Sequence, residues 1–196
     1  AEMCIRDSYI PRVLMNVNGT GVASALRMYP DVTLEHAILV HDELQRPFGK
    51  VAFKAGGSAA GHNGVRSVQQ VLRCGGRSMN QPDIARIRIG IDRPQDPSHD
   101  VGAYVLGAMP PAWLTACDFT PDGTPGPVLQ QLWQVLHSWC LSHIAPSCER
   151  KCARMAPLCV SMRQTQLFHL CHHLAICERH FCRRRHCQGC CYQRSH

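Results

Sequence analysis

Long apolar runs are absent from this sequence, and most of the chain carries no net charge. No run approaches the roughly 20 apolar residues that a transmembrane helix requires, so we expect no membrane anchor. Residues 1–145 contain as many acidic as basic side chains, and the formal net charge of +7 comes from residues 146–196. Global charge is therefore no reason to assign nucleic-acid binding to the first part of the chain.

Cysteine is scarce before residue 140 and abundant after it. Only Cys4, Cys74 and Cys117 come earlier, whereas ten follow, and three scattered cysteines are typical of a reduced intracellular domain. The first eight residues contain neither an initiator methionine at position 1 nor the apolar stretch of a secretory signal. We therefore expect an incomplete product in which residues 1–10 form an unrelated leader.

Apolar periodicity over residues 11–145 predicts strands that alternate with helices. We expect an extended run at 12–16 and strands at 37–42, 50–54 and 84–91. We expect helices at 21–29, 65–73, 101–106 and 128–144. Alternation of this kind predicts a layered α/β domain. The periodicity disappears beyond residue 146, where cysteine, histidine and arginine dominate.

Polar side chains gather at the ends of the apolar segments, where α/β folds place their sites. Asp42 follows the apolar run 37–40 and His41, and it is either a turn residue or a functional anion. Asn16 and Asn63 are individually weaker candidates, because asparagine more often caps a helix or forms a turn.

A glycine-rich loop at residues 56–64 precedes the helix expected at 65–73. Backbone N–H groups at such a junction favour an anion or a polarised carbonyl, although no P-loop or dinucleotide motif is present. Arg86 and Arg88 share one face of their predicted strand, which is either a solvated face or a phosphate clamp. The basic residues that flank the loop are Lys50, Lys54, Arg66, Arg86 and Arg88.

Four ordered segments together resemble bacterial-type peptidyl-tRNA hydrolases: residues 15–22, the block at 40–67, the strand at 86–94 and residues 104–107. The resemblance covers residues 11–145. It implies a single α/β domain, in which helices flank a twisted mixed β-sheet. It also implies cleavage of the ester that joins a peptide to the 3′ ribose of tRNA, which recycles the tRNA.

The resemblance also implies roles for three polar residues. Asp42 would accept a hydrogen bond from the catalytic histidine, which fixes its tautomer and stabilises the imidazolium. Asn16 and Asn63 would hold the 3′ end and peptide backbone of the substrate and position water. Asn63, or the loop N–H groups, would stabilise the oxyanion.

Other matches concern substrate binding. Lys54 and Arg88 correspond to the pair that grips a tRNA phosphate without reading bases. Leu14 stands where many members have an aromatic residue that stacks on the substrate. Asn18 and Asp92 replace the usual serine and glycine, and both replacements look tolerable.

The general-base histidine is the main departure from the family. Members begin with a strand that ends in Gly-Leu-Gly-Asn-Pro-Gly, followed by Thr-Arg-His, and neither segment occurs here. His41 should point away from Asp42, His62 matches a family histidine that is not the base, and His36 falls in a loop. We therefore expect a domain that lacks its first strand and its base, with a rate lowered by about 10²–10⁴.

The resemblance implies no metal and no other cofactor. It implies peptidyl-tRNA as the partner, no membrane, a monomer, and work in the cytoplasm or the mitochondrion. The alternative is a non-catalytic tRNA- or RNA-binding relative that keeps the substrate contacts.

Residues 146–196 do not resemble the family. Their cysteines and histidines suggest zinc, but the spacings form no clean paired set. The run Arg183, Arg184 and Arg185 either touches RNA or is solvated. We interpret this segment as a disordered or non-native tail.

Overall fold

A five-stranded mixed sheet with helices on both faces makes up the described part of the chain. The computed structural model describes residues 7–30, 32–74, 83–143 and 158–161. The strand order is β1-β5-β2-β4-β3, which confirms the predicted α/β class with a mixed sheet. The strands are β1 (Asp7–Tyr9), β2 (Ala37–Glu43), β3 (Val51–Lys54), β4 (Ala85–Gly90) and β5 (Leu158–Ser161).

Strand β2 lies in the middle of the sheet, parallel to β4 on one side and to β5 on the other. Strand β3 runs antiparallel to β4 at one edge. Strand β5 comes from the segment in which the sequence shows no apolar period, and it lies between β1 and β2. The rest of residues 146–196, with its proposed zinc ligands, lies outside the described residues.

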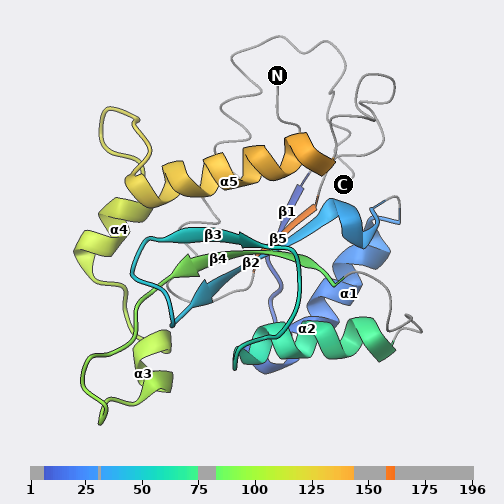
Figure 1. Cartoon of the computed structure of the whole chain (residues 1–196), viewed down its shortest axis with the longest axis horizontal. Helices are drawn as coiled ribbons and strands as arrows, with labels where there is room; N and C mark the ends of the chain where they lie inside the picture. The colour runs from blue at the N-terminus through green and yellow to red at the C-terminus, as the bar shows by residue number, and fades with distance from the viewer. Residues whose placement is uncertain (1–6, 31, 75–82, 144–157, 162–196) are drawn as a thin grey trace.

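Helices cover both faces of the sheet (Figure 1). Helix α5 (Pro127–His143) covers one face, and helices α1 (Asn18–Met28) and α2 (Asn63–Cys74) cover the other. Successive residues of β2 contribute to opposite cores, which explains why the strand is an unbroken apolar run. The core under α5 includes Ile38, Val40, Ile87, Ile89, Leu132 and Leu136, and the core under α1 and α2 includes Leu39, Ile84, Val22, Val65 and Val68.

The two helices on the second face approach each other closely at Gly19. A Cβ at that position would lie 2.3 Å from the carbonyl oxygen of Ser67 in α2. The Gly19 N–H donates to Ser67 Oγ at 3.0 Å. Only glycine permits this approach, which holds α1 and the segment before it against α2.

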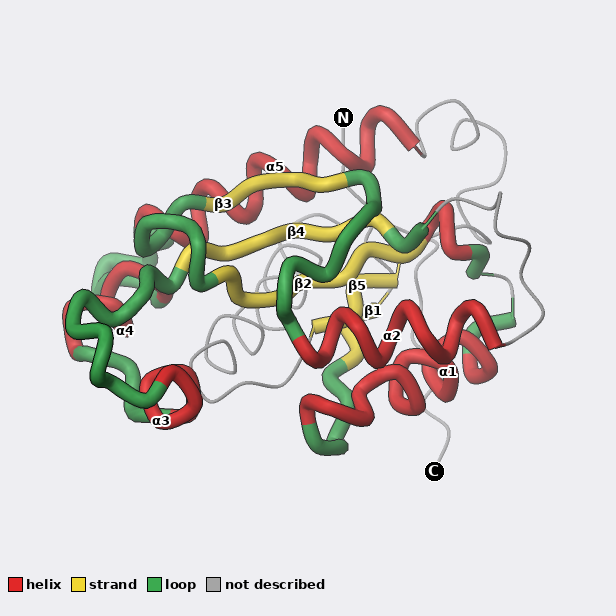
Figure 2. Tube along the Cα trace, turned by 60° about the horizontal axis from the view of Figure 1, so that its bottom comes forward, coloured by secondary structure: helices red, strands yellow, loops and turns green. Residues whose placement is uncertain are grey.

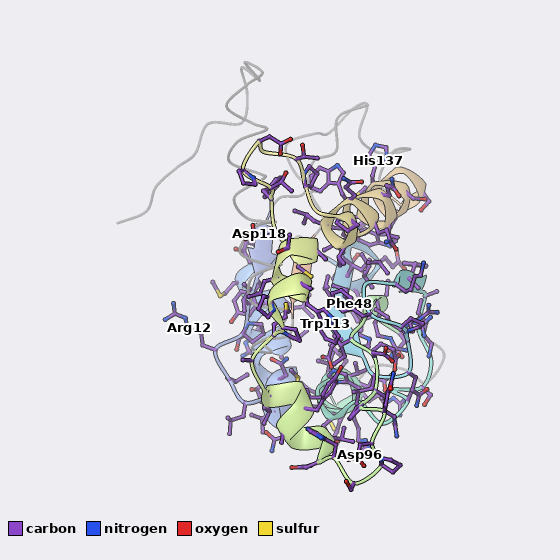
Figure 3. The ribbon with its side chains drawn as sticks, turned by 90° about the vertical axis from the view of Figure 1, so that its left-hand side faces the viewer. Arg12, Phe48, Asp96, Trp113, Asp118 and His137 are labelled. Atoms are coloured by element: carbon purple, nitrogen blue, oxygen red, sulfur yellow. The ribbon has the colours of Figure 1, made fainter. Side chains whose placement is uncertain are left out.

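Two short helices lie beyond one end of the sheet, as Figure 2 shows. Helix α3 (Val101–Leu106) was predicted from the sequence, whereas α4 (Pro111–Cys117) was not, because it is too short to show a helical period. Phe48, in the turn before β3, stacks on Trp113 of α4 with 3.9 Å between ring centroids (Figure 3). Tyr104 of α3 donates to the Ile91 carbonyl at 2.7 Å. These contacts attach α3 and α4 to the sheet.

The predicted extended run at 12–16 is wrong in its last part. Met15–Val17 forms a 3₁₀ helix, η1, in which the Val17 N–H donates to the Leu14 carbonyl at 3.1 Å. A second 3₁₀ helix, η2 (Leu34–His36), precedes β2. Among the described residues, no helix combines the length and apolarity needed to cross a membrane.

Candidate active site

The carboxylate of Asp42 and the imidazole of His62 meet at the end of β2. Asp42 is 2% exposed, and His62 is the residue before α2. His62 Nε2 lies 3.0 Å from Asp42 Oδ1. The Val65 N–H donates to His62 Nδ1 at 3.2 Å, which makes His62 the N-cap of α2. The histidine that the sequence analysis set aside is therefore the one that contacts Asp42.

These two contacts determine the tautomer of His62. Because Nδ1 accepts a backbone N–H, the proton of the neutral ring resides on Nε2 and is donated to Asp42. Neither ring nitrogen then has a lone pair available for another proton. A general base must accept a proton from water or substrate. In this arrangement His62 fixes the loop to Asp42 and cannot serve as the base.

His41 lies beside this pair but is inaccessible. It is 1% exposed, and its ring centroid lies 4.8 Å from that of His62 at an interplanar angle of 73°. Its Nδ1 donates to the Asp42 carbonyl oxygen at 2.6 Å, and its Nε2 has no partner among the described residues. Burial, aided by the neighbouring His62, lowers the pKa of His41 to about 3. A ring so hard to protonate is a poor base near neutral pH.

His36 lies at the opposite end of β2. Its Nδ1 is 2.9 Å from Thr33 Oγ1. The seven residues of β2 separate it from the Asp42 end by about 20 Å. The described residues thus offer no histidine beside Asp42 with an accessible ring nitrogen. They also contain no cluster of three or more His, Cys, Asp or Glu that could hold a metal.

The two predicted amide side chains lie on neighbouring elements. Asn63 is the exposed first residue of α2, directly after His62. Asn16 is exposed in η1, which packs against α2. Leu14 precedes η1 and is 75% exposed. The fold therefore brings the segment that carries Leu14 and Asn16 next to the helix that begins with Asn63.

The two predicted phosphate-binding cations have partners within the protein. Lys54 Nζ donates to the Ser58 carbonyl in the glycine-rich loop at 3.1 Å. Arg88 Nη1 lies 3.8 Å from Glu43 Oε2, with about a fifth of its side chain exposed. Arg88 pairs in register with Ala52, and Lys54 follows Ala52 by two positions. Residues two positions apart in a strand share a face, so both side chains project from the α1/α2 face of the sheet. The Arg88–Glu43 pair is half-buried, and its 3.8 Å separation is long for an ion pair.

Arg86 is the residue whose role the sequence analysis did not find. It is neither on a solvated face nor positioned as a clamp, because it is 1% exposed beneath the glycine-rich loop. In the sequence, Arg86 alternates with the apolar residues Ile87 and Ile89, a pattern that is typical of an exposed strand position. Only its position opposite Lys54, next to a loop of small residues, could have suggested burial.

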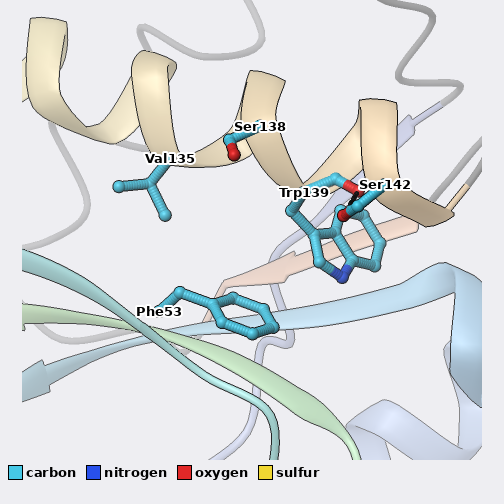
Figure 4. Close-up of a pocket in the computed structure, with 5 residues that line it drawn as sticks. All are labelled: Phe53, Val135, Ser138, Trp139 and Ser142. Atoms are coloured by element: carbon cyan, nitrogen blue, oxygen red, sulfur yellow. Dashed lines mark hydrogen bonds between the residues drawn. The ribbon is translucent and has the colours of Figure 1, made fainter.

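A cavity of about 210 Å³ lies on the other face of the sheet, between β3 and α5 (Figure 4). It is lined by Phe53, Val135, Ser138, Trp139 and Ser142. None of these side chains is ionisable in the neutral range, and Phe53 points away from the face that carries Lys54. The lining includes none of the residues assigned to the Asp42 site.

Comparison with known proteins supports a relationship over the same part of the chain. Residues 9–120 match the family model described as "Peptidyl-tRNA hydrolase". A protein of that name from Pelobacter propionicus is 45% identical over 113 residues, which cover 58% of this chain and 53% of the relative. A mouse protein named "Probable peptidyl-tRNA hydrolase" is 48% identical over 101 residues, which cover 52% of this chain and 45% of the relative.

The chain thus spans about half the length of the curated relatives that it matches. A crystal structure of peptidyl-tRNA hydrolase from Acinetobacter baumannii matches with a TM-score of 0.49 and 23% identity, covering 74% of this chain and 62% of that one.

Proposed function

The chain belongs to the peptidyl-tRNA hydrolase family, and from this we propose that the protein cleaves the ester between a peptide, or an N-blocked amino acid, and the 3′ ribose of tRNA. The observation that carries the proposal is the buried carboxylate of Asp42, which lies beside the start of α2 and is linked to it through His62. A charged acceptor and a helix N-terminus together suit a reaction that moves a proton and develops an oxyanion.

Each predicted site residue has a proposed task. Asp42 is proposed to accept the N–H of the general-base imidazole, a role that His62 does not fill, and to stabilise the positive charge on that base. Asn63 lies at the N-terminus of α2, where its amide and the helix dipole favour the negative oxygen of the tetrahedral intermediate. Asn16 holds the 3′ end of the substrate from the adjacent η1, and Leu14 offers an apolar surface beside it.

Lys54 and Arg88 are proposed to bind a tRNA phosphate. Their shared strand face lies next to the loop that carries His62, so a phosphate there would place the attached acceptor end near Asp42. Such a phosphate would compete with Glu43, whose Oε2 lies 3.8 Å from Arg88 Nη1. A contact of this kind positions the tRNA without reading its sequence.

We propose that the 196-residue chain by itself hydrolyses its substrate slowly. Among the described histidines beside Asp42, His62 has both nitrogens engaged and His41 is buried. Loss of a general base lowers a rate by about 10²–10⁴. A non-catalytic tRNA-binding protein is the second candidate function, and the same engaged nitrogens of His62 favour it.

Hydrolysis of N-acetylaminoacyl-tRNA, with and without imidazole as a soluble base, tests both candidates. We expect a slow reaction that imidazole accelerates beyond its effect on the substrate alone. Asp42→Asn should abolish the acceleration, and Glu35→Gln, which changes an exposed carboxylate in η2, should retain it.

Fast hydrolysis without imidazole, lost in His62→Asn, would refute the absence of a base. Binding of tRNA without hydrolysis under either condition would establish the non-catalytic function. In either case, Lys54→Met with Arg88→Met should weaken tRNA binding and make it less dependent on salt.

The partner proposed here is peptidyl-tRNA, bound by a monomer that needs no cofactor. Its substrate arises where ribosomes work, so we propose the cytoplasm or the mitochondrion as the site of action.

A further inference from the structure

The glycine-rich loop rests on the buried guanidinium of Arg86. Arg86 Nη2 donates to the Gly57 carbonyl at 2.5 Å, and Nη1 donates to the Ser58 carbonyl at 3.3 Å. Burial is the main cause that lowers the pKa of Arg86, although an arginine keeps its charge in proteins. Two consecutive backbone carbonyls are thus held by one forked cation, a geometry that lysine cannot reproduce.

A second set of bonds holds Gly57 from α2 and from the segment before β4. Gln69 Nε2 donates to the Gly57 carbonyl at 2.8 Å and to Asp83 Oδ2 at 2.5 Å. The Gly57 N–H donates to Asp83 Oδ2 at 3.2 Å. The peptide groups around Gly57 are therefore bonded on both sides, although Gly57 itself is exposed.

The short segment from Ser58 to His62 connects the fixed Gly57 to His62 and is itself held by hydrogen bonds. The Ala60 N–H donates to Ser58 Oγ at 3.2 Å, and the His62 N–H donates to the Ala59 carbonyl at 2.9 Å. Ala60 has a φ of 48°, a conformation that side chains rarely adopt, and Gly61 follows with a φ of 88°. A tight turn of this kind converts a displacement at Gly57 into a displacement of His62.

We propose that Arg86 is a positioning residue, which holds the glycine-rich loop so that His62 stays on Asp42 and Asn63 stays at the substrate end of α2. The inference rests on the proposed hydrolysis, because the loop has a chemical purpose only if Asp42 and Asn63 act on the ester. Arg86 reaches neither of them directly and acts through the Gly57 and Ser58 carbonyls. Gln69 assists from the exposed side of the same carbonyl.

The alternative is that Arg86 merely stabilises the core beneath the loop. The two roles predict that a substitution of Arg86 affects different parts of the protein. A stabilising residue alters the whole sheet evenly, whereas a positioning residue alters the loop and the catalytic step. Asp83 belongs to the network through Gly57 and Gln69, and Arg86 Nε has no partner among the described residues.

Hydrogen exchange and kinetics on Arg86→Lys, Gln69→Leu and the control Arg73→Met test the inference. Arg73 is an exposed arginine of α2 with no part in the loop contacts. In Arg86→Lys we expect the His62 amide to exchange about tenfold faster at unchanged protection of α5. With imidazole present, kcat should fall by about 10–100-fold while KM changes little. Gln69→Leu should act in the same direction less strongly, and Arg73→Met should match the parent chain.

Unchanged exchange at His62 in both Arg86→Lys and Gln69→Leu would overturn the inference. So would an equal rise in exchange over β2 and α5, because it would show a general loss of stability. If the parent chain hydrolyses nothing, the proposed function fails, but the exchange measurement still decides whether Arg86 holds the loop. Should Arg86→Lys not fold, Gln69→Leu provides the deciding result.

Discussion

The buried, neutral His41 should make the protein unstable in mild acid. Its pKa is lowered to about 3 in the folded chain, whereas an unfolded histidine titrates near 6.5. Below pH 6.5 the unfolded chain therefore binds a proton that the folded chain does not. Folding stability contributed by this residue is complete above pH 6.5 and falls as the pH decreases toward 3.

The magnitude follows from the two pKa values. Between pH 7 and pH 5 the loss is about 2 kcal/mol, and between pH 7 and pH 3 it is about 4 kcal/mol. Because a domain of this size has a free energy of unfolding of about 5–15 kcal/mol, the first loss alone is large. Asp42 offsets a charge on His41 only in part, through its carboxylate and its carbonyl, and Nε2 has no partner among the described residues.

Urea unfolding at pH 7 and pH 5 measures this loss in the parent chain and in His41→Asn. The asparagine amide can replace Nδ1 as the donor to the Asp42 carbonyl, but it does not titrate. We expect the variant to lose about 2 kcal/mol less than the parent between the two pH values. His99→Asn, at an exposed position, should behave like the parent. Equal losses in the parent and His41→Asn would refute the reasoning.

Three further changes should affect stability through single contacts. Gly90→Ala should lower the free energy of unfolding by about 3 kcal/mol, measured in urea, because its Cβ would lie 2.0 Å from the Pro47 carbonyl oxygen. Asp100→Ala should cost about 1 kcal/mol and speed exchange of the Gly102 amide, which the Asp100 carboxylate caps at 2.9 Å; unchanged exchange would contradict this. Leu132→Ala, at a fully buried site of α5, should cost about 2–5 kcal/mol by thermal unfolding, and a loss below 1 kcal/mol would show that α5 packs loosely.

Most of the secondary structure could be predicted from local pattern. The apolar run that became β2 and the amphipathic pattern of α5 depend on spacings within one element, which are visible in the sequence. Helix α4 and strand β5 could not be predicted in this way. Each is short, and β5 is held by pairing with strands far away in the chain, a property of the sheet and not of its own residues.

The candidate site also has a part that the sequence determines and a part that depends on the tertiary structure. The sequence by itself determined which residues are available: Asp42 at the end of a buried run, Asn63 after a glycine-rich loop, and the family to which the chain belongs. Only the tertiary structure decided what they contact. His62 and Asp42 are twenty positions apart, and Arg86 meets Gly57 across nearly thirty. Hydrogen bonds over such separations depend on how strands and loops cross in space, which no local pattern records.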